Sequence, residues 1–137
     1  MKVKLFFRSN RGVTLTQEDI RSVQLAKSAI CAGLETLLAS QKRTVGDLSR
    51  LFVAGGFGSF LNLKSAERIG LLPKGTAQKS AAVGNSALAG AAMLLLDKSL
   101  AHTAARLADT TTPLDLATNQ TFFEKYTEGM LFPESLS

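Results

Sequence analysis

The chain has 137 residues, 45% of them hydrophobic and 20% charged, which is the composition of one ordinary globular domain. The net charge of +5 would suit an anionic partner, but the basic residues are scattered among acidic ones and aromatic residues are few, so we do not expect nucleic-acid binding. No segment reaches the roughly 20 apolar residues of a membrane span and no signal peptide is evident, so we expect no membrane partner and a cytoplasmic location.

The chain has one cysteine, Cys31, and one histidine, His102. A single cysteine excludes an internal disulfide, and these two residues are too few for an iron–sulfur cluster or a cysteine-rich zinc site made by this chain alone. His102 falls off the apolar face of its expected helix and is given no role. Carboxylates occur singly, so the sequence predicts neither a metal site nor a catalytic group.

The first expected elements are a strand at residues 1–7, a turn at residues 8–12 and a long helix. Thr16 can cap the free N–H groups of that helix, and acidic Glu18 and Asp19 suit the positive end of its dipole. The apolar spacing predicts that the helix continues to about Ser40.

Lys27 interrupts the apolar stripe of this helix, because it lies between Val23 and Ile30. Either its aliphatic stem carries the ammonium to the surface, or the ammonium faces a polar cleft. Gln24 and Cys31 lie three residues before and four residues after Lys27, so the three side chains share one side of the helix.

The stretch on which the functional interpretation rests is the apolar run at residues 51–54 and the glycine turn after it, Gly55-Gly56-Phe57-Gly58. A buried strand that ends in glycines presents bare backbone at the carboxyl edge of a sheet, where ligands bind in open α/β folds. A tight turn without a ligand is the alternative, and the motif alone does not decide between them. A short helix at residues 64–69, ended by Gly70, should follow.

A second unit of the same kind comes next, with a strand at residues 80–83, a turn at Gly84 and Asn85, and a helix at residues 87–97. Asn85 or Ser86 is most simply the N-cap of that helix. The helix is apolar nearly all round, which predicts a central position in the core.

Two helices should complete the chain. The first is expected at residues 100–108. For the last, Thr121 and Glu124 form a capping box.

Both glycine turns aim backbone N–H groups and a helix N-terminus at one edge of the sheet, an arrangement that favours an anion or a nucleotide. Neither turn has the spacing of a P-loop or of a dinucleotide-binding fingerprint.

Five segments together resemble the C-terminal domain of the ATP-dependent reductive activators of corrinoid proteins. They are TQEDI at 16–20, QLAKSAI at 24–30, AGGFG at 54–58, IGLLP at 69–73 and VGNSALAGA at 83–91. The resemblance covers roughly residues 16–133. It implies an α/β fold: a three-layer, ribonuclease-H-like half of an actin-like ATPase, with a partly parallel sheet and helices on both faces, formed by residues 1–137 as a single domain.

The resemblance also implies a nucleotide site. The glycine pair of the first turn would lie against the adenosine and its adjoining phosphate, and the helix that carries Gln24 would touch adenine and ribose. The resemblance favours the interpretation in which the Lys27 ammonium faces a cleft over the one in which its stem carries the ammonium to the surface. The implied nucleotide-binding residues are Gln24, Lys27, Gly55, Gly56, Phe57, Gly58, Gly84 and Asn85.

In such activators an iron–sulfur domain passes an electron to a corrinoid protein, and ATP drives the step. This sequence lacks the cysteine-rich ferredoxin portion and the acidic phosphate-binding loops that hold Mg²⁺. We therefore expect an excised domain of a longer protein or a degenerate remnant, which does not hydrolyse ATP by itself. The alternatives are a non-catalytic docking or dimerisation module of a ferredoxin-like protein, and half of another actin-like activator or kinase.

Overall fold

The computed structural model of the chain describes residues 5–8, 14–56 and 58–134. The strands are β1 (Leu5–Arg8), β2 (Thr14–Thr16), β3 (Leu51–Ala54) and β4 (Ser80–Gly84). The α-helices are α1 (Gln17–Ser40), α2 (Leu63–Arg68), α3 (Ser86–Leu96), α4 (Leu100–Thr110) and α5 (Gln120–Glu128), and 3₁₀ turns lie at Val45–Asp47, Gly58–Phe60 and Ala77–Lys79.

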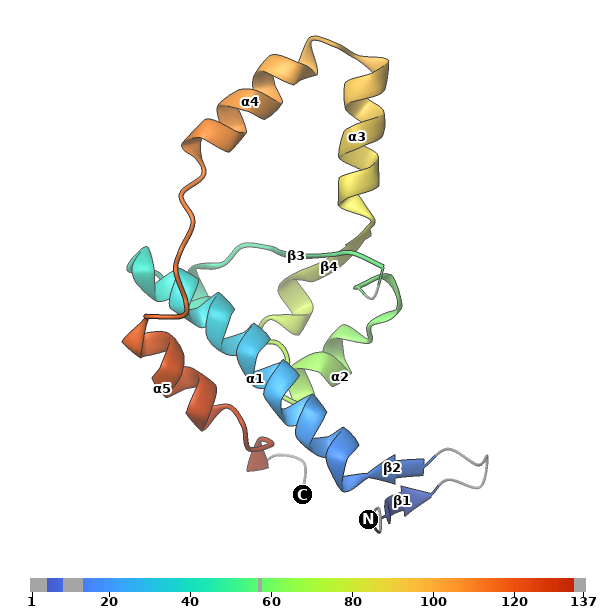
Figure 1. Cartoon of the computed structure of the whole chain (residues 1–137), viewed down its shortest axis with the longest axis vertical. Coiled ribbons are helices and arrows are strands. Elements are labelled where there is room, and N and C mark those ends of the chain that lie inside the picture. The colour runs from blue at the N-terminus through green and yellow to red at the C-terminus, as the bar shows by residue number, and fades with distance from the viewer. Residues whose placement is uncertain (1–4, 9–13, 57, 135–137) are drawn as a thin grey trace.

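An antiparallel pair, β1 with β2, leads directly into α1 (Figure 1). Of the strand and turn expected at residues 1–12, residues 1–4 and 9–12 lie outside the described residues, and Leu5–Arg8 is a strand. The expected cap of α1 is confirmed. The Thr16 hydroxyl accepts a hydrogen bond from the Asp19 N–H at 3.1 Å, and the Asp19 carboxylate accepts one from the Thr16 N–H at 2.8 Å. α1 ends at Ser40, as expected.

β3 and β4 pair in parallel, with Phe52 opposite Ala81. The connection between them passes through α2, because parallel neighbours need a crossover. α2 ends as expected, with Gly70 in the left-handed region at φ +80°. The parallel arrangement of these two strands confirms the predicted α/β class.

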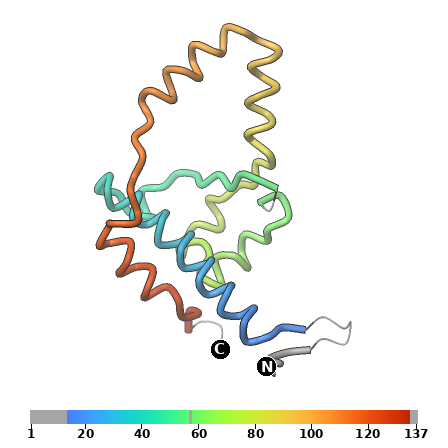
Figure 2. The backbone as a smooth tube through the Cα atoms, in the orientation of Figure 1, coloured from blue at the N-terminus to red at the C-terminus, as the bar shows by residue number. Residues whose placement is uncertain are grey.

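Figures 1 and 2 show α5 and the segment after α2 lying beside α1. Most of the well-buried residues belong to α1 and to the segment after α2. The well-buried apolar side chains described there are few and mostly small: Ala32, Ala66 and Leu72. The buried side of α1 is largely polar, since Lys27, Ser28 and Thr36 are each no more than 2% exposed.

The helix expected to be central, α3, is exposed along its length. Neither α3 nor α4 buries any residue, and together they form an arm that leaves the body after β4 and returns through residues 111–119 to α5 (Figure 2). The prediction of a central position is therefore wrong for this chain. Apolar residues all round a helix predict burial only where another layer packs on it, and the described residues place no such layer against α3.

The prediction of a capping box at Thr121 and Glu124 is also wrong. α5 begins two residues earlier, with the Asn119 side chain accepting a hydrogen bond from the Phe122 N–H at 3.1 Å. The Glu124 carboxylate instead accepts a hydrogen bond from the side-chain amide of Gln120 at 2.9 Å. Asparagine is at least as good an N-cap as threonine, so the earlier start prevails.

In the described part of the chain no helix is long and apolar enough to cross a membrane.

Candidate functional site

The first glycine turn follows β3 and leaves its backbone open. Gly55 has φ +101°, a conformation that strains residues with a Cβ atom, and a Cβ placed on Gly55 or Gly56 would meet nothing within 4 Å. Gly58 is different, because a Cβ there would lie 3.0 Å from Val53 Cγ1. Gly58 therefore lets the chain fold back onto β3, whereas Gly55 and Gly56 border open space. Phe57 lies outside the described residues.

The second turn follows β4 and starts α3. Gly84 has φ +66°, and the Asn85 side chain accepts a hydrogen bond from the Leu88 N–H at 3.0 Å. Asn85 is thus the N-cap of α3, as the simplest interpretation had it.

The structure brings the two turns together. The Gly55 N–H donates to the Gly84 carbonyl at 2.7 Å, directly beyond the parallel pairing of the strands. Ser59, just after the first turn, lies with its Oγ 3.7 Å from a Cβ placed on Gly84. The adjacency predicted for the two turns is therefore correct, and both occupy the carboxyl edge of the sheet. That edge offers glycine backbone and the N-terminus of α3, which suit an anionic ligand.

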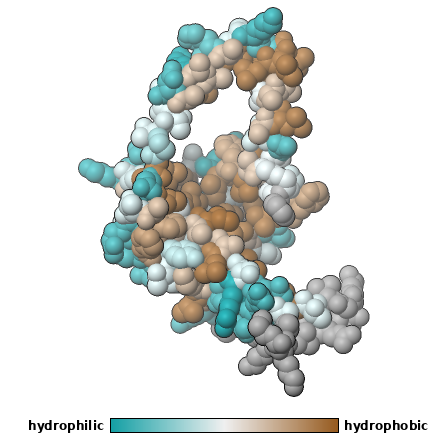
Figure 3. Space-filling model, viewed as in Figure 1, coloured by the Kyte–Doolittle hydropathy of each residue, from teal (hydrophilic) through white to brown (hydrophobic). Residues whose placement is uncertain are grey.

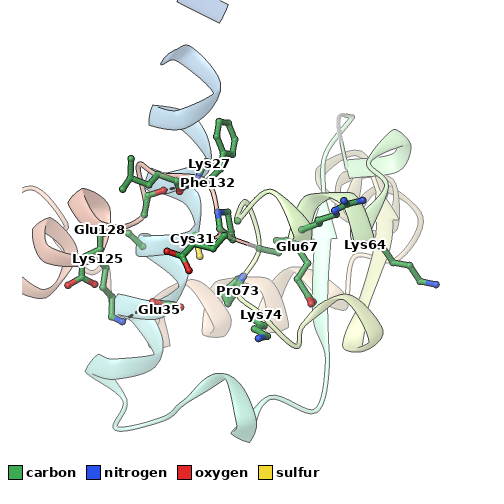
Figure 4. Close-up of a pocket in the computed structure, with 18 residues that line it drawn as sticks. Lys27, Cys31, Glu35, Lys64, Glu67, Pro73, Lys74, Lys125, Glu128 and Phe132 are labelled. Atoms are coloured by element: carbon green, nitrogen blue, oxygen red, sulfur yellow. Dashed lines mark hydrogen bonds and ion pairs between the residues drawn. The ribbon is translucent and has the colours of Figure 1, made fainter. Parts of the chain in front are cut away.

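Lys27 lies elsewhere, between α1 and the end of α5. Its side chain is 2% exposed, and Nζ donates to the carbonyls of Gly129 at 2.5 Å and Leu131 at 2.7 Å. Nζ also lies 5.1 Å from the centre of the Phe132 ring (Figure 4). Gly129 is the C-cap of α5, where carbonyls lack an intrahelical donor and carry the negative end of the dipole, so the ammonium suits this position. Leu131 lies two residues further on, outside the helix.

The environment of Lys27 differs from the surface alternative that its spacing left open. Lys27 does line a cavity, as the cleft alternative had it, but its ammonium is held by the protein. The ammonium neither reaches the surface nor stands free in a cleft, because two protein carbonyls hold it. Burial lowers the pKa of this ammonium from its ordinary value, and the nearby Cys31 has a smaller opposite effect. Gln24, one turn earlier, is half-buried.

A cavity of about 650 Å³ opens between α1, the segment after α2 and the end of α5 (Figure 4). Lys27 and Cys31 line it from α1, Pro73 from the segment after α2, and Phe132 from the C-terminal side. Its described lining includes none of the glycine-turn residues. The structure therefore separates the predicted site into a glycine edge and a cavity that holds Lys27.

The cavity contains charged groups that the sequence analysis missed. Glu35 and Lys125 form an ion pair at 2.8 Å, and this hydrogen bond raises the pKa of Lys125. Burial raises the pKa of the Cys31 thiol to about 11, and the charge of Glu35 acts in the same direction, so the thiol is protonated near neutral pH. One signal in the sequence could have indicated this side of the cavity. It is the four-residue spacing that puts Lys27, Cys31 and Glu35 on one face of α1.

No group of three or more histidine, cysteine or acidic side chains suited to a metal ion occurs among the described residues. What the described groups offer is binding: open glycine backbone at one edge, and a cavity with both apolar and charged walls.

Comparison with known proteins agrees with the resemblance seen in the sequence. Residues 2–137 match the family model described as the C-terminal domain of RACo, the ASKHA domain. The corrinoid activation enzyme RamQ of Eubacterium limosum is 35% identical over 126 residues, which are 92% of this chain and 21% of that protein. A [Co(II) methylated amine-specific corrinoid protein] reductase of Methanosarcina barkeri is 32% identical over 117 residues, which are 84% of this chain and 22% of that protein.

A solved structure, of a reductive activator for corrinoid, iron–sulfur protein, superposes with a TM-score of 0.82 at 35% identity. The match covers 90% of this chain and 20% of that one, so the chain spans about a fifth of the length of the relatives it matches. The expected actin-like fold is thereby confirmed. The chain belongs to the family of RACo C-terminal ASKHA domains.

Proposed function

We propose that this chain is the ATP-binding half-domain of a reductive activator, which couples ATP hydrolysis to iron–sulfur-mediated reduction of a corrinoid protein or a similar metalloprotein. The printed names of two relatives and of the matching solved chain, all activators or reductases of corrinoid proteins, support this proposal. Since the chain spans about a fifth of those proteins, the iron–sulfur cluster and the groups that hold Mg²⁺ would belong to the other four fifths.

The observation that carries the proposal is the hydrogen bond from the Gly55 N–H to the Gly84 carbonyl at 2.7 Å. It puts two glycine turns and the start of α3 at one sheet edge. In the proposal, Gly55 and Gly56 lie against the adenosine and its adjoining phosphate, and Gly84 and Asn85 border the same ligand. Phe57 and Gly58 are the remaining proposed contacts from the first turn.

Gln24 and Lys27 remain proposed contacts from α1. Two of the three N–H groups of the Lys27 ammonium already donate to the carbonyls of Gly129 and Leu131, which leaves one for a nucleotide. Gln24 is half-buried and lies on the same side of α1. We therefore propose Gln24 as the direct contact of the two and Lys27 as a group that fixes the position of α1.

A docking or dimerisation module is the second candidate, favoured by the exposed apolar side chains of α3. The two candidates differ in their need for the glycine turn. A docking module would bind its partner equally well with or without nucleotide, and after substitution of Gly56.

The test is calorimetric titration of Mg²⁺-ATP into the full chain assembled with the complementary region of the solved activator, meaning the part that precedes the matched segment. Gly56→Val should weaken binding at least tenfold, because valine would occupy open space at the turn without clashing with the protein. Gly46→Val, in a remote and equally exposed turn, is the matched control and should bind like the wild type. Equal affinity of the Gly56→Val and wild-type assemblies would refute the proposal.

A further inference from the structure

The cavity beside Lys27 has the size of a small-molecule site. Its volume of about 650 Å³ falls within the roughly 300–1,000 Å³ of pockets that bind drug-sized ligands. None of its described lining residues belongs to the glycine turns, on which the proposed nucleotide site rests. The cavity can therefore take a ligand of its own, and its charges and apolar surface indicate the chemistry of that ligand.

Positive charge exceeds negative charge in the described lining, which has five cationic and four acidic side chains. Three of the acidic groups are already engaged. Glu35 forms the ion pair that raises the pKa of Lys125, and the charge of Glu128 adds to this rise. The Glu67 carboxylate accepts a hydrogen bond from the Ala77 N–H at 2.5 Å, and this bond lowers the pKa of Glu67 below its ordinary value. The excess of one positive charge suits a monoanion.

Three cations of the described lining are not engaged in this way. Lys64, Arg68 and Lys74 make no side-chain hydrogen bond or ion pair within the described chain. Figure 4 shows Lys64 directed away from α1, and Lys74 beside Pro73 on the segment after α2. Arg68 lines the cavity from the last turn of α2. Arg68 and Lys74 are therefore the groups available to an anion, and a guanidinium can bind a carboxylate through two parallel hydrogen bonds.

Another part of the lining is uncharged. The Phe132 ring and Pro133 line the cavity from the C-terminal side, and Pro133 Cγ would lie 3.4 Å from a Cβ placed on Gly70. Burial raises the pKa of the Cys31 thiol to about 11, so this side chain is neutral near pH 7. A ligand that packs on these groups needs an apolar body, and an aromatic ring suits a wall made of phenylalanine and proline.

We propose that this cavity binds a small organic monoanion, an aromatic or branched aliphatic carboxylate. The carboxylate lies against Arg68 and Lys74, and the apolar body lies against Cys31 and Phe132. The ligand touches α1, α2 and the segment after α5 at once, so its binding holds the C-terminal segment against the body. The site is distinct from the glycine edge, and it needs no nucleotide.

The test titrates three probes of one shape into the isotope-labelled full chain, without nucleotide, in an NMR experiment. The probes are para-tert-butylbenzoate, the neutral para-tert-butylbenzamide and the cationic para-tert-butylbenzylamine. The carboxylate should shift the Gly70 and Gly129 amides saturably and leave the Gly55 and Gly84 amides unmoved. The neutral probe should bind at least tenfold more weakly, and the cationic probe should not approach saturation at about 10 mM.

A double variant, Arg68→Gln with Lys74→Gln, should weaken binding of the carboxylate at least tenfold. Both side chains are exposed, so the substitutions leave the packing of the body intact. The matched control is Lys98→Gln with Arg106→Gln, which removes the same charge from the arm formed by α3 and α4. Figure 3 shows an opening between that arm and the body, and the control should bind like the wild type.

Three outcomes would overturn the proposal: no saturable shift with the carboxylate up to about 10 mM, equal affinity for the three probes, or equal weakening in the control variant. Gly56→Val should bind the carboxylate like the wild type, although we expect it to bind nucleotide poorly. Loss of the carboxylate in Gly56→Val would place the ligand at the glycine edge and would also overturn the proposal. Failure at this cavity and failure of nucleotide binding are therefore separate results.

Discussion

Substitution of Lys27 with methionine removes the ammonium that joins α1 to the end of α5. The Lys27 side chain is 2% exposed, and its Nζ donates to Gly129 and Leu131 at 2.5 Å and 2.7 Å. Methionine has nearly the same length but no donor, so both carbonyls lose their partner. A buried acceptor left unpaired costs about 1–3 kcal/mol, so the loss of both partners would cost roughly 2–6 kcal/mol if both carbonyls were fully buried. Leu131 is 75% exposed, so water offsets part of this cost.

The cost of burying a charge acts in the opposite direction. Burial lowers the pKa of Lys27, which means that the folded protein holds the charged form less well than water does. Removing the ammonium relieves this cost, which offsets part of the loss. We therefore expect Lys27→Met to lower the free energy of unfolding by about 2 kcal/mol, the lower end of the range.

Urea unfolding at pH 7, followed by circular dichroism, measures this difference. Lys98→Met, at an exposed lysine in the turn between α3 and α4, is the control and should leave stability nearly unchanged. A Lys27→Met variant as stable as the wild type, or more stable, would refute the reasoning. It would mean that Lys27 faces an open cleft and that water satisfies the two carbonyls.

The same pair of proteins gives a pH prediction. Because the folded-state pKa of Lys27 lies below its ordinary value of 10.5, the unfolded chain binds more protons at this site above neutral pH. The contribution of Lys27 to the free energy of unfolding should therefore rise with pH between the lowered pKa and 10.5. Loss of the proton does not remove the two hydrogen bonds, because a neutral amine still has two hydrogens to donate to the carbonyls. The stability difference between the wild type and Lys27→Met should grow over this range, and a shrinking difference would contradict the assignment.

The remaining predictions use the same unfolding assay. Gly129→Ala should cost about 1–3 kcal/mol, because a Cβ there would lie 2.7 Å from Ser28 Oγ; a neutral effect would mean that the interface of α1 and α5 is loose. Gly70→Ala should cost about 1–3 kcal/mol, because alanine is strained at φ +80°, and an unchanged midpoint would argue against this conformation. Asn119→Ala should cost about 1 kcal/mol and Thr121→Ala much less, and the reverse order would restore Thr121 as the cap of α5.

Local chemistry in the sequence predicted the elements well where the deciding contacts are close along the chain. Thr16 and Asp19 lie three residues apart, and Gly70 ends α2 through its own backbone conformation. The predicted start of α5 was wrong although the deciding residues are equally local, because Asn119 and Thr121 are both acceptable caps and the prediction took the threonine over the better-ranked asparagine.

Burial could not be predicted in the same way. The sequence of α3 is that of a core helix, yet what covers a helix depends on other layers, and the described residues place none there. The two parts of the candidate site differ in the same way: one could be predicted from the sequence and the other could not. The pairing of β3 with β4 made the adjacency of Gly55 and Gly84 predictable, whereas the carbonyls that hold Lys27 lie about a hundred residues further on, with no local signal.

Nucleotide binding at the glycine edge is tested most directly by the amide signals of Gly55, Gly56 and Gly84. The isotope-labelled chain would be assembled with the complementary activator region and titrated with Mg²⁺-ATP in an NMR experiment. We predict saturable shifts at these three amides, with Gly46 unmoved as the internal reference. Saturable ATP binding that leaves the three glycine amides unmoved would contradict the assignment of the nucleotide to this edge.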